Sequence, residues 1–266
     1  MNWGMENRLR RILDPSDGRT VMLAVDHGYF LGPLTGLERL DRTLEPLLPH
    51  ADCLMITRGA LRRAVPPAMR IPVMLRVSGG TSIASDEAGV SSLSNEALTC
   101  DVEDAIRLNA AGITASIFVG TEHERQTLTN LTALVDAGER WGIPVMAVTA
   151  VGRQMARDLR YLSLASRIAV ELGAHMVKTY FCDGFEKLVE ACPVPVVIAG
   201  GKKVPERDAL ELARRAVDAG AAGVDMGRNI FQSAAPAAMI RAVRGIVHDG
   251  LTVGEAWQLV EPELAR

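Results

Sequence analysis

Eight short apolar runs are spaced along the whole chain, and stretches with helical periodicity lie between most of them. Each run is rich in β-branched residues and nearly apolar throughout, as is typical of a strand covered on both sides of a sheet. The runs are TVMLAVDHG from Thr20, DCLMIT from Asp52, IPVMLRVSGG from Ile71, ITASIFVG from Ile113, IPVMAVTAVG from Ile143, HMVKTYF from His175, VPVVIAGGKK from Val194 and AGVDMGRN from Ala222. Strands that alternate with helices predict a parallel sheet, and eight repeats favour a closed (β/α)8 TIM barrel.

A doubly wound open sheet is the alternative to the barrel. It requires a glycine-rich turn after the first strand, and the segment DHGYFLGP lacks the GxGxxG spacing. We therefore expect a single α/β barrel domain over residues 1–266, with a short N-terminal extension and a C-terminal helix. The long connection 78–100 follows the third strand, at the end of the barrel where active sites lie in this fold class.

Composition restricts the partners of the chain. Its 29 Lys and Arg residues are balanced by 32 Asp and Glu residues, and a net charge of −3 gives no reason to expect nucleic acid as a partner. No stretch reaches the ~18 uninterrupted apolar residues of a membrane span, and the N-terminus has no apolar core of a signal peptide. The cysteines have no paired spacing, so we expect free thiols in a soluble, cytoplasmic protein; they are Cys53, Cys100, Cys182 and Cys192.

Glycines and cations at the ends of the seventh and eighth strands predict a phosphate site. Adjacent glycines let backbone amides approach an anion, and a lysine or arginine neutralises it. The loops after these two strands are the usual phosphate site of (β/α)8 enzymes. A phosphorylated small molecule is thus the expected ligand, the alternative being glycines that only turn the chain and charges that are solvated. The candidate phosphate-binding residues are Gly200, Gly201, Lys202, Lys203, Gly227 and Arg228.

Lys178 is the candidate nucleophile. The chain holds only four lysines, and this one interrupts the apolar run HMVKTYF. If Met176 and Tyr180 share its face, the side chain points into the barrel. Burial disfavours the charged ammonium group, and a neutral amine can attack a carbonyl carbon to form a Schiff base. The alternative is that Lys178 only forms an ion pair with Asp26 across the barrel.

Asp26 and His27 end the first strand and are the candidate proton carriers. Because neighbouring residues of a strand point to opposite faces, we expect one of the two to face the substrate, and Asp26 is the first choice. Four further strand-end residues are candidates for the pocket wall: Arg58, Ser78, Thr149 and Tyr180. The other histidines lack HxH or HxxxH spacing, so no metal site is predicted.

Several of these strings together resemble the DhnA-type class I aldolase family over nearly the whole chain: MLAVDHGYF, LMITRG, VKTYF, IAGGKKVPER and GVDMGRNIFQS. The resemblance implies a (β/α)8 barrel in which Lys178 forms the Schiff base and Asp26 transfers protons. It also implies phosphate-binding loops that contain Gly200, Gly201, Gly227 and Arg228. Members of the family commonly assemble as homodecamers of two pentameric rings, which implies self-association of this chain.

Two departures from the family pattern bear on the substrate. The family's sugar-phosphate aldolases have a tyrosine at the end of strand five, whereas this chain has Ala150 near that place, as a thiolase-like member would. The connection after strand three is also longer, by several residues around SDEAGVS.

The resemblance to thiolase-like members implies an activity. It is the Schiff-base cleavage of 3-hydroxy-5-phosphonooxypentane-2,4-dione, a step in the breakdown of the phosphorylated quorum-sensing signal autoinducer-2. Coenzyme A would be the co-substrate, with no permanently bound cofactor. One alternative is a class I aldolase that acts on a sugar phosphate such as fructose 1,6-bisphosphate. Another is a phosphosugar-binding protein without turnover.

Overall fold

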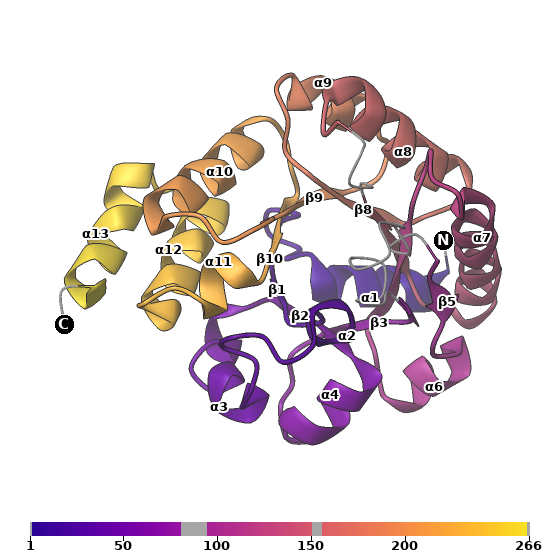
Figure 1. Cartoon of the computed structure of the whole chain (residues 1–266), viewed down its shortest axis with the longest axis horizontal. Coiled ribbons are helices and arrows are strands. Elements are labelled where there is room, and N and C mark those ends of the chain that lie inside the picture. Colours follow the sequence, from indigo (N-terminus) through magenta and orange to yellow (C-terminus); the bar gives the residue numbers. More distant parts are fainter. Residues whose placement is uncertain (1, 81–94, 151–155, 265–266) are drawn as a thin grey trace.

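Eight parallel strands close into a barrel with helices around it (Figure 1), which confirms the predicted (β/α)8 fold. The structure, a computed structural model, describes residues 2–80, 95–150 and 156–264. Around the barrel the order is β1-β10-β9-β8-β7-β6-β3-β2. Seven barrel strands lie within the predicted runs, and β6 begins one residue before its run. The strands are β1 Thr20–Ala24, β2 Cys53–Thr57, β3 Val73–Arg76, β6 Gly112–Ile117, β7 Val145–Thr149, β8 Met176–Thr179, β9 Val196–Ala199 and β10 Gly223–Met226.

Helices cover the outside of the barrel (Figure 1). Aspartate side chains cap the N-termini of two of them, with Asp101 preceding α6 and Asp158 preceding α8, while Gly142 ends α7 in the left-handed conformation. The helices are α1 Trp3–Ile12, α2 Gly28–Leu31, α3 Leu40–Leu44, η1 Leu48–His50, α4 Arg58–Ala64, α6 Val102–Arg107, α7 Glu124–Trp141, α8 Leu159–Glu171, α9 Phe185–Glu190, α10 Glu206–Asp218, α11 Arg228–Phe231, α12 Pro236–His248 and α13 Val253–Leu264.

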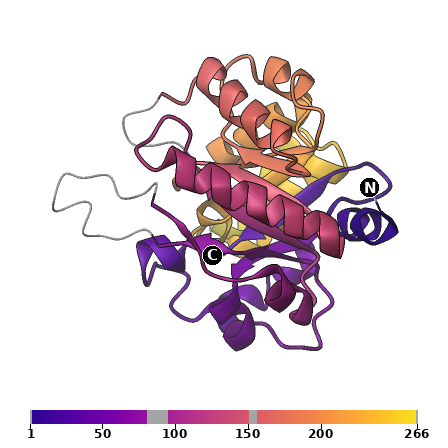
Figure 2. The same ribbon diagram turned by 90° about the vertical axis from the view of Figure 1, so that its right-hand side faces the viewer.

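The inside of the barrel has an apolar, methionine-rich layer. Met22, Met74 and Met176 belong to one buried cluster, together with Ile12 from α1. Figure 2 shows α1 beside the C-terminal end of α7, where Arg8 Nη1 donates a hydrogen bond of 2.9 Å to the Gly142 carbonyl. Because inward-facing residues alternate along a strand, the next inward positions after Met74 and Met176 are Arg76 and Lys178, toward the carboxyl ends of the strands. After Met22 the next inward position is the apolar Ala24.

A small second sheet follows β3. Its antiparallel strands β4, Ser78–Gly79, and β5, Ala97–Leu98, pair at the two ends of the long connection. We did not predict this sheet, because two-residue strands carry no periodicity that a sequence can reveal. The SDEAGVS segment, to which the extra length of the connection was assigned, lies outside the described residues.

The four cysteines are free and buried. Within residues 2–80, 95–150 and 156–264, no helix combines the length and the hydrophobicity that crossing a bilayer requires.

His248 joins the amino-terminal end of the barrel to α12. Its Nδ1 and Nε2 atoms each lie 2.7 Å from a carboxylate, Asp17 and Asp52 respectively. The hydrogen bond to Asp52 is the largest contribution that raises the pKa of His248 above its usual value, and the bond to Asp17 adds to it. A raised folded-state pKa means that the protonated histidine stabilises the folded protein.

We therefore expect His248→Ala to lower the free energy of unfolding by about 2 kcal/mol at pH 5.5. Part of this loss comes from the positive charge of His248. That part should be fully present below the unfolded-state pKa of about 6.5, and it should disappear as the pH rises through the folded-state pKa. Urea denaturation of both proteins between pH 5.5 and 9 measures it. A difference that stays constant or grows with pH would contradict the assignment.

Candidate active site

Two buried ion pairs stand at the carboxyl end of the barrel. Lys178 Nζ, from β8, lies 2.9 Å from Asp225 Oδ2 of β10. Arg76 Nε, from β3, donates a hydrogen bond of 2.9 Å to Asp26 Oδ2, which follows β1. All four residues are buried. Lys178 therefore points into the barrel as predicted, but its ion-pair partner is Asp225 and not Asp26, the partner that the sequence suggested.

The two carboxyl groups differ in acidity. Burial alone acts to raise the pKa of Asp26, but the charges of Arg76 and Lys178 outweigh it and hold this pKa below the usual value. Burial raises the pKa of Asp225, and the nearby charge of Lys178 offsets the rise only in part. Neighbouring acids whose pKa values are pushed apart commonly take different roles in proton transfer. Here Asp26 is the more acidic of the two carboxyl groups, and Asp225 is the one that more readily holds a proton.

Arg76 is held by further polar residues. Its Nη1 atom donates to Ser116 Oγ at 2.8 Å and to Ser78 Oγ at 3.5 Å. Ser78 in turn donates to the buried Glu96, which also accepts a hydrogen bond of 2.9 Å from the Tyr29 hydroxyl. Burial raises the pKa of Tyr29, so the hydroxyl stays protonated as a donor. This chain of contacts fixes the position of the Arg76 guanidinium group at the barrel mouth.

His27 packs against the loop after β10. Its ring lies edge-on to Phe231, with the centroids 5.6 Å apart, and a Cβ atom at Gly227 would come within 2.5 Å of its Cε1 atom. Burial lowers the pKa of His27 to about 4, so the imidazole is neutral at neutral pH. Its Nδ1 atom is 3.8 Å from Asp26 Oδ1. In its neutral form the His27 imidazole can accept or donate a proton only weakly. The neighbouring Asp26 carboxylate is ionised.

The loops after β9 and β10 lie side by side at the predicted phosphate site. Asn229 Nδ2 donates to the Gly200 carbonyl at 2.7 Å, and Asn229 Oδ1 accepts from the Val204 amide at 2.9 Å, so this side chain ties the two loops together. Gly201 has a φ of +71°, which favours glycine, and a Cβ there would meet nothing within 4 Å. Arg228 Nε is buried and has no hydrogen-bond partner in the described part of the chain.

The two lysines after β9 differ. Lys203 Nζ donates to Glu206 Oε1 at 2.8 Å and to the Val204 carbonyl at 2.7 Å, so its charge is already paired. Lys202 is exposed at the surface. Because the charge of Lys203 is paired with Glu206, Lys202 is the better candidate of the two for contact with an anion.

The remaining candidates occupy three places. Thr149 Oγ1 donates to Thr179 Oγ1 at 2.7 Å, next to Lys178. The guanidinium group of Arg157 lies 3.7 Å from the centroid of the Tyr180 ring. Arg58 binds Asp104, at 2.9 Å, outside the ring of strands. These three are thus not brought together into one group.

A family model described as "DeoC/LacD family aldolase" matches residues 20–233. The chain belongs to this aldolase family. It is 56% identical over 264 residues to a 3-hydroxy-5-phosphonooxypentane-2,4-dione thiolase of Enterobacter sp. (strain 638), covering 99% of this chain and 88% of that protein.

A second relative with the same name, from Yersinia pseudotuberculosis, is 57% identical over 97% of this chain and 87% of its own length. The solved structure of an archaeal fructose 1,6-bisphosphate aldolase is similar with a TM-score of 0.78 and 25% identity, over 92% of this chain and all of that one. These findings confirm the predicted resemblance to class I aldolases. The protein is an enzyme of the aldolase family.

Three residues of this candidate site were not predicted from the sequence. Arg76 and Asp225 each interrupt an otherwise apolar strand run, VMLRV and GVDM, which is the same signal that identified Lys178. Asn229 follows Arg228 directly in the phosphate motif MGRN. In residues 2–80, 95–150 and 156–264, no cluster of three or more His, Cys, Asp or Glu side chains could hold a metal ion.

Proposed function

We propose that this enzyme is a lysine Schiff-base thiolase that cleaves 3-hydroxy-5-phosphonooxypentane-2,4-dione with coenzyme A, giving dihydroxyacetone phosphate and acetyl-CoA. The buried Lys178–Asp225 pair at the barrel mouth carries this proposal. The names of relatives that are more than half identical over nearly the whole chain support the choice of substrate. Such a reaction would place the enzyme in the breakdown of phosphorylated autoinducer-2.

Asp225 can generate the nucleophile. Because burial raises its pKa, this carboxylate can accept a proton from Lys178 across the 2.9 Å contact. Transfer of the proton leaves a neutral amine beside a neutral acid, which a dry site favours over two separated charges. The amine then attacks the C4 carbonyl of the substrate, and loss of water gives an iminium ion on Lys178.

Carbon–carbon cleavage follows from that iminium ion. The sulfur of coenzyme A forms a bond to C2, and its proton goes to a base, for which ionised Asp26 is suited. The C2–C3 bond breaks, its electron pair moves into the iminium, and acetyl-CoA leaves. Protonation of the resulting enamine at C3, by Asp26 or through His27, and hydrolysis of the iminium release dihydroxyacetone phosphate and restore Lys178.

The phosphate group, at the other end of the substrate, would bind at the loops after β9 and β10. Gly201 leaves open space beside its backbone, whereas Gly200 and Gly227 are packed closely against Met226 and the Ala24 carbonyl and serve the close approach of the two loops. Arg228 offers a buried Nε donor without a partner in the described residues. Holding the phosphate there fixes C4 beside Lys178, and such positioning can lower a barrier by about 7 kcal/mol or more.

Assembly and location are part of the same proposal. Trp3 is 78% exposed and Trp141 is 47% exposed, and the contact between Arg8 and Gly142 brings their helices together. An apolar surface of this kind supports self-association, for which the family resemblance suggests a homodecamer. Coenzyme A and phosphorylated metabolites are cytoplasmic, which supports a cytoplasmic location.

An assay that compares two reactions tests the proposal. The enzyme should form acetyl-CoA from the phosphorylated dione only when coenzyme A is present, and borohydride reduction with dihydroxyacetone phosphate should add that product to the protein mass. Cleavage of fructose 1,6-bisphosphate without coenzyme A would identify an aldolase instead. Substrate binding with neither turnover nor a borohydride adduct would identify a binding protein.

A further inference from the structure

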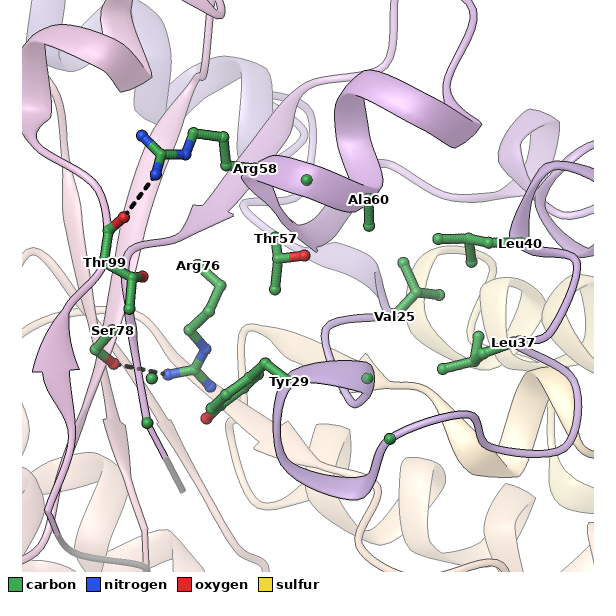
Figure 3. Close-up of a pocket in the computed structure, with 15 residues that line it drawn as sticks. Val25, Tyr29, Leu37, Leu40, Thr57, Arg58, Ala60, Arg76, Ser78 and Thr99 are labelled. Carbon is green, nitrogen blue, oxygen red and sulfur yellow. Dashed lines mark hydrogen bonds between the residues drawn. The ribbon is translucent and has the colours of Figure 1, made fainter. Parts of the chain in front are cut away.

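A cavity of about 500 Å³ opens beside the barrel mouth, within the roughly 300–1,000 Å³ range of small-molecule sites. It lies between the segments that follow β1, β2 and β3 (Figure 3). The phosphate loops follow β9 and β10, so this cavity is separate from them. Counted around the closed barrel, β2 lies opposite β8 and β3 lies opposite β9. The cavity therefore faces Lys178 from the other side of the mouth.

Arg76 belongs to both the cavity and the mouth. Its guanidinium group lines the cavity, as Figure 3 shows, and it also binds Asp26 at 2.9 Å. A molecule that fills the cavity thus reaches the group that holds the ionised base. The phosphate of the substrate is bound on the β9 and β10 side, so the substrate carbons farthest from it extend toward Arg76.

The lining suits a long ligand with alternating polar and apolar parts. Val25, Leu37 and Leu40 form an apolar wall, whereas the Thr57 hydroxyl and the backbone at Gly79 offer polar groups. A pantetheine chain has this character, since it carries two amides, a branched apolar carbon and a terminal thiol.

Positive charge gathers at the outer edge of the cavity. Arg58, which lines it, shares the carboxylate of Asp104 with Arg62 and Arg107. Asp101, 3.9 Å from Arg107, is the other acid of this group, so three arginines face two carboxylates. The excess of positive charge complements the phosphates of a nucleotide that lies outside the cavity.

We propose that this cavity holds the pantetheine arm of coenzyme A, with its thiol at the Arg76 end and its phosphates near Arg58. The assignment rests on the proposed thiolase function. The two substrates would then enter from opposite sides of the mouth, with the acyl carbon of one meeting the sulfur of the other near Asp26.

Two substitutions narrow the cavity without touching the lysine. The Ala60 methyl group points into the space between Thr57 and Leu40 (Figure 3), so Ala60→Phe places a ring there. Gly59 also lines the cavity, and a Cβ at this position would meet nothing within 4 Å, so Gly59→Leu adds bulk without a clash. Gly254→Leu, in α13, is the matched control for Gly59→Leu. Gly59 and Gly254 are each the second residue of a helix, and each is exposed and without close neighbours.

We expect both cavity variants to raise the KM for coenzyme A by about tenfold or more and to weaken its binding in calorimetric titration by a similar factor. The borohydride adduct with dihydroxyacetone phosphate should form as in the unmodified enzyme, and Gly254→Leu should match that enzyme throughout. An unchanged KM for coenzyme A in both variants overturns the assignment. So does loss of the adduct in both, because the cavity would then belong to the phosphorylated substrate.

The titration separates this proposal from the proposed function. If the unmodified enzyme binds coenzyme A, more weakly in both cavity variants, yet forms no acetyl-CoA, the thiolase function fails and the cavity assignment stands. If it forms acetyl-CoA and the cavity variants keep the same affinity, the cavity assignment alone fails. If the unmodified enzyme neither binds coenzyme A nor forms acetyl-CoA, both fail.

Discussion

Lys178→Met is expected to lower turnover by a factor on the order of 10⁴ or more, because the thioether cannot form the iminium ion that accepts the electrons of the breaking bond. Formation of acetyl-CoA measures the rate, and intact mass after borohydride reduction with dihydroxyacetone phosphate measures the adduct. Lys187→Met, on the exposed face of α9, is the matched control and should keep both. An adduct of unchanged mass in Lys178→Met would place the Schiff base on another lysine.

The same substitution should also change stability. It leaves Asp225 buried without the cation that lies 2.9 Å from it, and the loss of one partner of a buried pair costs about 3–5 kcal/mol. Because the pKa of Asp225 is already raised, protonation of the carboxyl group should recover part of this loss as the pH falls. Denaturation of the single variant and of Lys178→Met/Asp225→Leu separates the two effects. The double variant should be the more stable one and still inactive.

Asp26→Asn is expected to lower kcat by about 10²–10⁴-fold, since an amide cannot take the thiol proton. It also leaves the buried Arg76 without its counter-charge, for a loss of about 3–5 kcal/mol in the free energy of unfolding at pH 7. Because the folded-state pKa of Asp26 is lowered, the stabilisation by its charge is present above about pH 4 and is lost as the pH falls through the folded-state value. The difference in the free energy of unfolding between the unmodified protein and Asp26→Asn should therefore shrink only in strong acid.

A surface ion pair provides the control for Asp26. Asp183 is fully exposed and lies 3.3 Å from Arg215. Because solvent screens this exposed pair, Asp183→Asn should leave both the free energy of unfolding and kcat nearly unchanged. If Asp26→Asn behaved like this control in both measurements, Asp26 would be neither a proton carrier nor the partner that holds Arg76.

The fold and the buried position of Lys178 could be predicted because both depend on patterns along one strand at a time. Each barrel strand is covered on both faces, so each appears as an apolar run, and a charged residue within such a run must point to a place that tolerates it. Lys178 met this condition, and so did Arg76 and Asp225, although we did not single out the last two. The glycines of the loops after β9 and β10 were visible for the same reason, as local backbone requirements.

The partners of these residues depend on how the strands close. The sequence by itself determined that eight covered strands alternate with helices and that a lysine lies inside one of them. Only the tertiary structure decided that β10 delivers Asp225 to Lys178, that Asp26 binds Arg76 instead, and that Glu206 holds Lys203. It alone also revealed the cavity beside Arg76. Ion pairs and cavities form between segments far apart in the chain, and their energies depend on distance and burial, which no periodicity along the chain records.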